Sequence, residues 1–151
     1  MPNVGDHVQG GVLFYSATTF GWVAAEKDLN PAYWGCYQTA IDGTSTALRW
    51  GSSNTDIIVS GCTGNTMIAA TLCSNYSYSG YTDWFLPSKD ELNEMYLAKD
   101  IIGGFDMTDN YWSSSQYNDQ CAYIQYFLTG TQSELGGKDQ LYRVRPIRIY
   151  T

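Results

Sequence analysis

The chain has 151 residues, a length suited to one domain that spans residues 1–151 and buries most of its apolar surface. Hydrophobic residues make up 44% of the sequence, so we expect a packed core rather than disorder. The formal net charge of −7 argues against nucleic acids and heparin-like polymers as partners, and no apolar run is long enough for direct insertion into a membrane.

The first predicted elements are two short apolar runs at residues 10–15 and 21–25. Each run is opened by glycine, and together they are typical of a β-hairpin. Residues 28–55 contain many small polar residues, so they are predicted to connect elements with little regular structure. Asn54 and Asn65 each precede an apolar run, and asparagine is a common N-cap. We therefore expect a helix to begin near each of them.

The clearest local signal is the S-x-x-E pattern of Ser88 and Glu91, which predicts a capping box at a helix start. The helix should bury one stripe, formed by Leu92, Met95 and Tyr96, and end at the glycine pair 103–104. Residues 83–85 just before it are expected to be extended, with their aromatic side chains buried. From Tyr111 onwards, apolar runs separated by polar turns predict several short strands.

An enzyme needs catalytic groups that converge, and the sequence offers no such set. The serines at 113–115 stand outside a G-x-S-x-G motif, and His7 is the one histidine that could serve as a base. Asp83 and Glu91 could form a carboxylate pair for sugar hydrolysis, but a turn and a helix cap explain them better. We expect a protein that is not an enzyme and needs no cofactor.

The sequence predicts no metal site, because it contains neither a C-x-x-C motif nor a D-x-D-x-D-G calcium loop. The four cysteines leave two interpretations open, disulfides in an exported protein or free buried thiols. The arginines Arg143, Arg145 and Arg148 could form an anion site. Pairing with carboxylates or backbone carbonyls is favoured, since the protein is acidic.

Several motifs together resemble one known family. They include G-G-V-L-F-Y at 10–15, W-G-C at 34–36, S-G-C at 60–62, D-W-F-L-P-S-K-D-E-L at 83–92 and Y-W-S-S-S at 111–115. On these residues the chain resembles the Lcl C-terminal-type domain, a bacterial and phage module, over nearly its whole length. The resemblance implies an α+β, C-type-lectin-like fold with short antiparallel strands, two main helices and much irregular loop.

A subset of these domains is similar to the variable proteins of diversity-generating retroelements, in which a reverse transcriptase rewrites a C-terminal segment mainly at template adenines. The corresponding segment here is 111–148. The residues in it that resemble the fixed frame of the variable proteins are 111–115, Ala122, Phe127, Gly130, Lys138 and 143–145. The resemblance implies that the positions between these frame residues are replaceable and bind the ligand. They are Tyr117, Asn118, Asp119, Cys121, Ile124, Tyr126, Leu128, Thr131, Ser133, Leu135, Gly136, Asp139, Leu141 and Tyr142.

The resemblance also implies a disulfide between Cys36 and Cys62 and an unpaired Cys121. The calcium motifs E-P-N, Q-P-D and W-N-D of sugar-binding C-type lectins are absent, so calcium-dependent sugar binding is not implied. Some relatives bind sulfated polysaccharides through a basic surface, and the net charge of −7 argues against that property here.

If residues 122–128 form a strand, alternation places Ile124, Tyr126 and Leu128 on one face. We expect this face to be exposed as an apolar row beside Tyr142, the alternative being that both faces are buried. Replacing these residues together should then remove binding and leave folding intact.

The thirteen tyrosines fit either a β-rich core or a binding surface. With the resemblance, they favour a ligand-binding display domain that recognises an unknown protein or glycan receptor on a cell surface. Such a domain would belong to a phage virion, to a bacterial cell surface or to a secreted protein, although no signal peptide is visible. The alternative is a carbohydrate-binding adhesin domain of fixed specificity, from a bacterial surface or phage tail protein.

Overall fold

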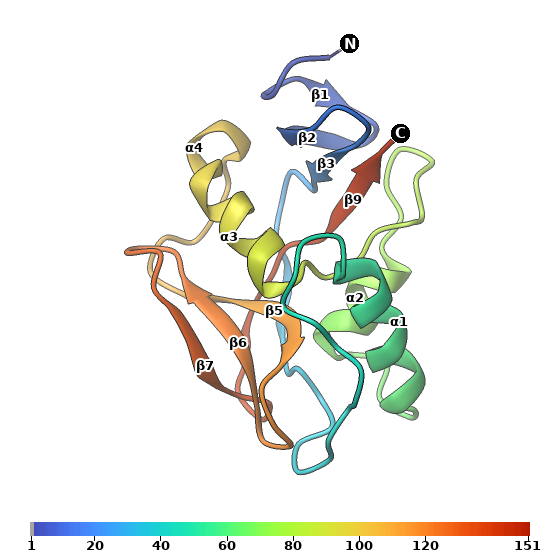
Figure 1. Cartoon of the computed structure of the whole chain (residues 1–151), viewed down its shortest axis with the longest axis vertical. Helices are drawn as coiled ribbons and strands as arrows, with labels where there is room; N and C mark the ends of the chain where they lie inside the picture. Colours follow the sequence, from blue (N-terminus) through green and yellow to red (C-terminus); the bar gives the residue numbers. More distant parts are fainter. Residues whose placement is uncertain (1) are drawn as a thin grey trace.

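The structure is a computed structural model that describes residues 2–151, and in that range it has two β-sheets and four helices (Figure 1). The α+β class expected from the sequence is confirmed. Two longer helices are present, as expected, and two shorter ones accompany them. The four are α1 (Gly51–Gly61), α2 (Ala69–Asn75), α3 (Lys89–Leu97) and α4 (Lys99–Ile102).

The first sheet brings the two ends of the described chain together in the upper part of Figure 1. Its order is β1-β2-β3-β9, with strands His7–Val8, Gly11–Ser16, Gly21–Ala24 and Ile147–Tyr150. Strands β2 and β3 form the antiparallel hairpin predicted from the two apolar runs. The C-terminal strand β9 then pairs with β3, so the last strand of this sheet is added by a contact between distant parts of the sequence.

The second sheet carries the segment predicted to bind a ligand. Its order is β4-β8-β5-β6-β7, with strands Leu29–Ala32, Tyr142–Val144, Asn110–Gln116, Cys121–Tyr126 and Gln132–Gly137. The series of short strands expected after Tyr111 is confirmed. Strand β4 lies in the stretch predicted to lack regular structure. That prediction failed because β4 is stabilised by pairing with β8, more than a hundred residues later.

Helix α1 begins at Gly51 and not at Asn54, so the predicted N-cap is wrong. Asn54 instead lies within the helix. Its buried side chain donates to the Ser45 carbonyl at 2.7 Å and accepts from the Ser45 amide at 2.9 Å. The first helical amide, that of Gly51, donates instead to Oε1 of Glu91 at 3.1 Å. The second helix also begins later than expected, at Ala69, whose amide donates to the carbonyl of Tyr33 at 2.9 Å.

The capping box predicted at Ser88 and Glu91 is present. The Ser88 hydroxyl accepts from the Glu91 amide at 3.3 Å, and Oε1 of Glu91 accepts from the Ser88 amide at 2.9 Å. In α3, Leu92 and Met95 are buried as predicted, while Tyr96 is half-buried. The predicted element breaks into α3 and α4 and ends at Gly103, which adopts a positive φ of 79°.

The three C-terminal arginines pair with carboxylates of the fold, which is the interpretation that the acidic composition favoured. Each pairs with aspartate: Arg143 with Asp106 and Asp109 at 3.0 and 3.1 Å, Arg145 with Asp28 at 2.8 Å, and Arg148 with Asp83 at 2.7 Å. The last pair accounts for Asp83, which the sequence assigned only to a turn. Hydrogen bonding to Arg148 lowers the pKa of the Asp83 carboxyl.

Candidate functional site

The fourteen positions predicted to bind a ligand divide into three groups by exposure. Two of them, Ile124 and Gly136, are buried. Four are half-buried: Cys121, Tyr126, Ser133 and Tyr142. Eight are exposed: Tyr117, Asn118, Asp119, Leu128, Thr131, Leu135, Asp139 and Leu141. Only the last group is fully available to a partner.

The expectation that Ile124 faces solvent is wrong, since only 7% of its surface is exposed. Strand β6 lies between β5 and β7, and Ile124 pairs with Trp112 on one side and Ser133 on the other. Its side chain belongs to the same core cluster as Trp34 and Trp112. Alternation predicted correctly which residues share a face, but not that neighbouring strands and loops would cover that face. The expected apolar row therefore does not form, and replacing Ile124 should disturb folding.

Gly136 lies in a close contact that leaves no room for a side chain. A Cβ atom at this residue would lie 2.6 Å from the carbonyl oxygen of Ala122 and 2.6 Å from Cγ2 of Ile124. Both distances are far below van der Waals contact, and the first is to backbone. Any side chain at this position would therefore push β6 and β7 apart.

We expect Gly136→Ala to lower the free energy of unfolding by about 2 kcal/mol, because overpacking a close contact strains its neighbours. The matched control is Gly137→Ala, whose Cβ would meet only side-chain atoms of the exposed residues Asp139 and Gln140. Urea unfolding of both variants tests this. Equal stability of the two variants would show that the β6–β7 contact can relax and that position 136 tolerates variation.

The remaining members of the predicted row are also separated. Leu128 is exposed but lies in the turn beyond the end of β6. Tyr142 lies in β8, where its ring meets that of Trp112 edge-on at 4.9 Å. Because β6 and β7 each have six residues, the turn with Leu128 and Thr131 lies at one end of the hairpin. The β5–β6 turn with Tyr117 lies about 16–20 Å away at the other end.

At this second end three loops meet. The Gln38 amide donates to the carbonyl of Asp119 at 2.8 Å, and the Lys138 amide donates to the carbonyl of Gln120 at 2.9 Å. The Gly35 amide in turn approaches the carbonyl of Lys138 at 3.4 Å. Residues 33–40, 117–120 and 138–141 are thus joined by backbone hydrogen bonds.

A buried cation lies under these loops. The Lys138 side chain has no exposed surface, and its Nζ donates to the Thr39 carbonyl at 3.0 Å and to Oε1 of Gln116 at 2.7 Å. The same ammonium lies 4.7 Å from the ring centre of Trp34. Burial lowers the pKa of Lys138 to about 8. The Lys138 side chain therefore joins its own loop to the loop of Thr39 and to Gln116, the last residue of β5.

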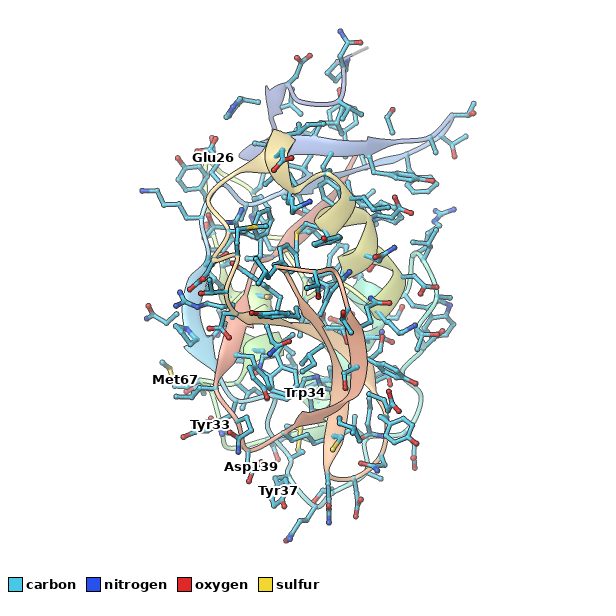
Figure 2. All side chains as sticks on the ribbon, turned by 90° about the vertical axis from the view of Figure 1, so that its left-hand side faces the viewer. Glu26, Tyr33, Trp34, Tyr37, Met67 and Asp139 are labelled. Atoms are coloured by element: carbon cyan, nitrogen blue, oxygen red, sulfur yellow. A yellow bond between two sulfur atoms is a disulfide. The ribbon has the colours of Figure 1, made fainter. Side chains whose placement is uncertain are left out.

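The loops carry several exposed side chains at this end of the sheet, which together we call the loop-end surface. Tyr33 stands next to Leu141, because Ala32 and Tyr142 are paired in β4 and β8. Figure 2 shows Tyr33, Tyr37 and Asp139 together at the lower edge of the molecule. The loop-end surface consists of Tyr33, Tyr37, Tyr117, Asn118, Asp119, Asp139 and Leu141, all of them exposed.

Sequence reasoning missed Tyr33 and Tyr37, since it confined binding to the C-terminal segment. They are 46% and 43% exposed. The signal in the sequence that could have identified them is their position in an irregular stretch, one before and one after Trp34. With Tyr117 and Leu141 they give the surface a broad aromatic and apolar area, while Asp119 and Asp139 supply hydrogen-bond acceptors.

The serines that could suggest a nucleophile serve the scaffold. All three at 113–115 are buried. The Ser113 hydroxyl donates to the carbonyl of Tyr123 at 2.7 Å, and the Ser115 hydroxyl donates to the carbonyl of Ser45 at 2.9 Å. Among residues 2–151, the His, Cys, Asp and Glu side chains form no group of three or more that could hold a metal ion.

Cys36 and Cys62 are joined by a disulfide, which ties the loop of Tyr37 to the end of α1. Cys121 is free and half-buried, and Cys73 is free and buried. Burial raises the pKa of the Cys73 thiol above its usual range. The disulfide thus anchors one of the three loops that form the loop-end surface.

Comparison with known proteins assigns the family. The family model of the Lcl C-terminal domain matches residues 39–148, which is most of the chain. The chain belongs to the Lcl C-terminal domain family. The matched span of this Lcl domain includes Lys138, Gly136 and the β5–β6 turn, whereas Tyr33 and Tyr37 precede it.

A structural neighbour of the Lcl domain is a fimbrial protein from Bacteroides ovatus ATCC 8483. The two align with a TM-score of 0.59 and 16% sequence identity, over 87% of this chain and 36% of the other. The likeness shows a shared fold, and this chain spans about a third of that protein's length. No curated protein matches the sequence. Of the helices in the described part of the chain, none has the length and apolar character needed to cross a bilayer.

Proposed function

We propose that this Lcl domain is a ligand-display module that recognises a receptor through its loop-end surface. One observation carries the proposal: three separate loops meet over buried Lys138, and they carry exposed tyrosines and exposed aspartates. Tyrosine offers a large contact area at low entropic cost, so such a surface suits recognition of another macromolecule. The scaffold that we propose is C-type-lectin-like.

The proposed setting is the surface of a bacterium or a phage virion, or a secreted protein. Membership of the Lcl family and a fold shared with a fimbrial protein both support an adhesin-like role. The partner that we propose is a protein or glycan receptor on a cell surface. A nucleic acid partner is disfavoured by the net charge of −7. The role proposed is binding, without catalysis and without a cofactor.

We further propose that the domain is a variable protein of a diversity-generating retroelement. Its support is the frame of the segment, in which Tyr111, Trp112, Phe127 and Lys138 are buried while eight of the positions between frame residues are exposed. Ile124 and Gly136 should be nearly invariant even in a diversified set. Ile124 in β6 is buried, and Gly136 in β7 lies too close to β6 to carry a side chain. Sequencing the surrounding locus tests the idea. A near-copy of the segment's DNA that differs at adenines, beside a reverse transcriptase gene, is expected.

The second candidate is a carbohydrate-binding adhesin domain of fixed specificity. Exposed tyrosines beside carboxylates also suit sugars, since aromatic faces contact C–H groups and carboxylates accept hydrogen bonds from hydroxyls. A glycan array with and without calcium separates the two candidates. Binding to one glycan class, together with a locus that has neither template copy nor reverse transcriptase, would favour this second function.

The loop-end surface makes a direct prediction. We expect the triple variant Tyr33→Ala, Tyr37→Ala, Tyr117→Ala to bind receptor-bearing cells about tenfold or more weakly, because exposed aromatic anchors dominate interfaces. Flow cytometry with fluorescently labelled domain and a panel of intact cells measures this. The thermal midpoint should change by only a few degrees, since all three residues lie on the surface and are about half exposed.

The matched control is the double variant Leu128→Ala, Leu135→Ala, whose side chains are 55% and 67% exposed outside the loop-end surface. Its binding should equal that of the wild type. Loss of binding in this control, with the triple variant unaffected, would move the site to the β6–β7 turn and edge strand and reject the loop-end proposal.

A further inference from the structure

A separate cleft lies away from the loop-end surface. Its larger lobe, about 290 Å³ in volume, is lined by residues 7–11 together with Glu26, Tyr78 and Ser79. A smaller and more enclosed lobe of about 100 Å³ is lined by Glu26, Lys27, Tyr76 and Tyr78. Glu26 and Tyr78 line both lobes, so the two are adjacent, and we refer to them together as the Glu26–Tyr78 cleft. In Figure 2, Glu26 lies near the upper end of the molecule, opposite Tyr33 and Tyr37.

Two tyrosines shape the smaller lobe. The rings of Tyr76 and Tyr78 are parallel within 5°, with their centres 6.3 Å apart. Tyr76 is braced by Trp84, which meets it edge-on at 5.0 Å, and the indole N–H of Trp84 donates to the carbonyl of Tyr81. Tyr78 is 48% exposed. One ring is therefore fixed by the core while its neighbour is open to solvent.

The polar groups of the cleft include both donors and acceptors. Oε1 of Glu26 lies 3.0 Å from Nδ1 of His7, and the remaining carboxylate oxygen has no partner among the described residues. Burial, and after it the neighbouring Tyr78 and Glu26, raise the pKa of the Tyr76 hydroxyl, which keeps that group a donor. Lys27 is exposed at the rim. One carboxylate and one ammonium leave the cleft close to electrically neutral.

These features select a class of ligand. An anion would meet Glu26, and a cation would meet Lys27, so neither charge is favoured. Aromatic faces bind apolar C–H groups, whereas the carboxylate accepts and the phenol hydroxyls donate hydrogen bonds, and the hydroxyl groups of a ligand can serve both. We propose that the Glu26–Tyr78 cleft is a second binding site, which takes a neutral saccharide. The proposal stands on these residues alone and is independent of the loop-end surface.

An array of neutral glycans, probed with the labelled domain, tests the proposal. We expect weak binding to at least one glycan, with a Kd on the order of 1 mM when the free sugar is titrated by NMR. Both Tyr78→Ala and Glu26→Gln should weaken it about tenfold or more. The second variant keeps the side-chain shape and lies on the surface, so it reports binding even if Tyr78→Ala affects folding.

The control is Leu128→Ala, which removes an exposed side chain outside both the cleft and the loop-end surface and should leave this affinity unchanged. Three outcomes overturn the proposal: no neutral glycan bound above the level of Glu26→Gln, binding that survives both cleft variants, or binding of only choline or a sulfated sugar. Failure of the loop-end proposal would appear differently, as wild-type cell binding by the Tyr33, Tyr37 and Tyr117 triple variant.

Discussion

Replacing Glu91 with alanine should lower the free energy of unfolding by about 4 kcal/mol, because it leaves three backbone amides, two of them buried, without an acceptor. The Glu91 carboxylate accepts from the amides of Ser88 at 2.9 Å, Arg49 at 2.9 Å and Gly51 at 3.1 Å. It has no exposed surface. Burial raises the pKa of this carboxyl even though the three amides favour its charged form. Its burial is therefore compensated only while all three donors are in place.

The effect should reach two helices at once. Ser88 caps α3, and the Gly51 amide begins α1, so one carboxylate stabilises both N-termini. Urea unfolding monitored by circular dichroism measures the loss. The matched control is Glu94→Ala, which removes the same charge from the same helix at a half-buried position and should cost less than about 1 kcal/mol. Equal losses in the two variants would contradict a capping role that extends to α1.

Replacing Lys138 with methionine should lower the free energy of unfolding by about 3 kcal/mol at neutral pH. Methionine fills a similar volume, but it leaves the Thr39 carbonyl without its ammonium donor and removes the charge from the face of Trp34. Because Lys138 connects the loops of the loop-end surface, receptor binding should weaken together with stability. The matched control is Lys89→Met, which removes a half-buried ammonium 5.4 Å from the Tyr123 ring and should have a small effect.

The pH dependence of this variant is a separate observable. The folded-state pKa of Lys138 is about 8, below its ordinary value of 10.5. Between these two values the unfolded chain binds more protons at this residue, so the stability contribution of Lys138 rises with pH. We expect wild-type stability to gain about 1 kcal/mol per pH unit relative to Lys138→Met between pH 8 and 10. Parallel stability curves for the two proteins would show that the ammonium is not desolvated.

Local sequence signals predicted the elements whose stabilising contacts lie close in sequence. The β2–β3 hairpin and the capping box of Ser88 and Glu91 follow from residues a few positions apart, and both are confirmed. The start of α1 could not be predicted in this way. Its first amide is capped by Glu91, forty residues later, while Asn54 makes its hydrogen bonds to Ser45 inside the fold.

The candidate site shows the same division. The family resemblance placed the candidate positions in the C-terminal segment, and Tyr117, Asp119 and Leu141 among them are exposed. It could not predict that Ile124 is covered, because that depends on which strands and loops pack against β6. Nor could it include Tyr33 and Tyr37, which reach the surface through contacts of their loop with residues 117–120 and 138–141.

By itself, the sequence determined the family through its motifs, and with the family the α+β class. Its periodicity and capping signals act over a few residues and located single elements. Only the tertiary structure decided which of the candidate positions are available to a ligand. That outcome depends on pairing between β4 and β8, on the burial of Lys138 beneath three loops and on the close contact of Gly136 with Ile124. Each of these contacts joins parts of the chain whose proximity cannot be predicted from a local sequence pattern.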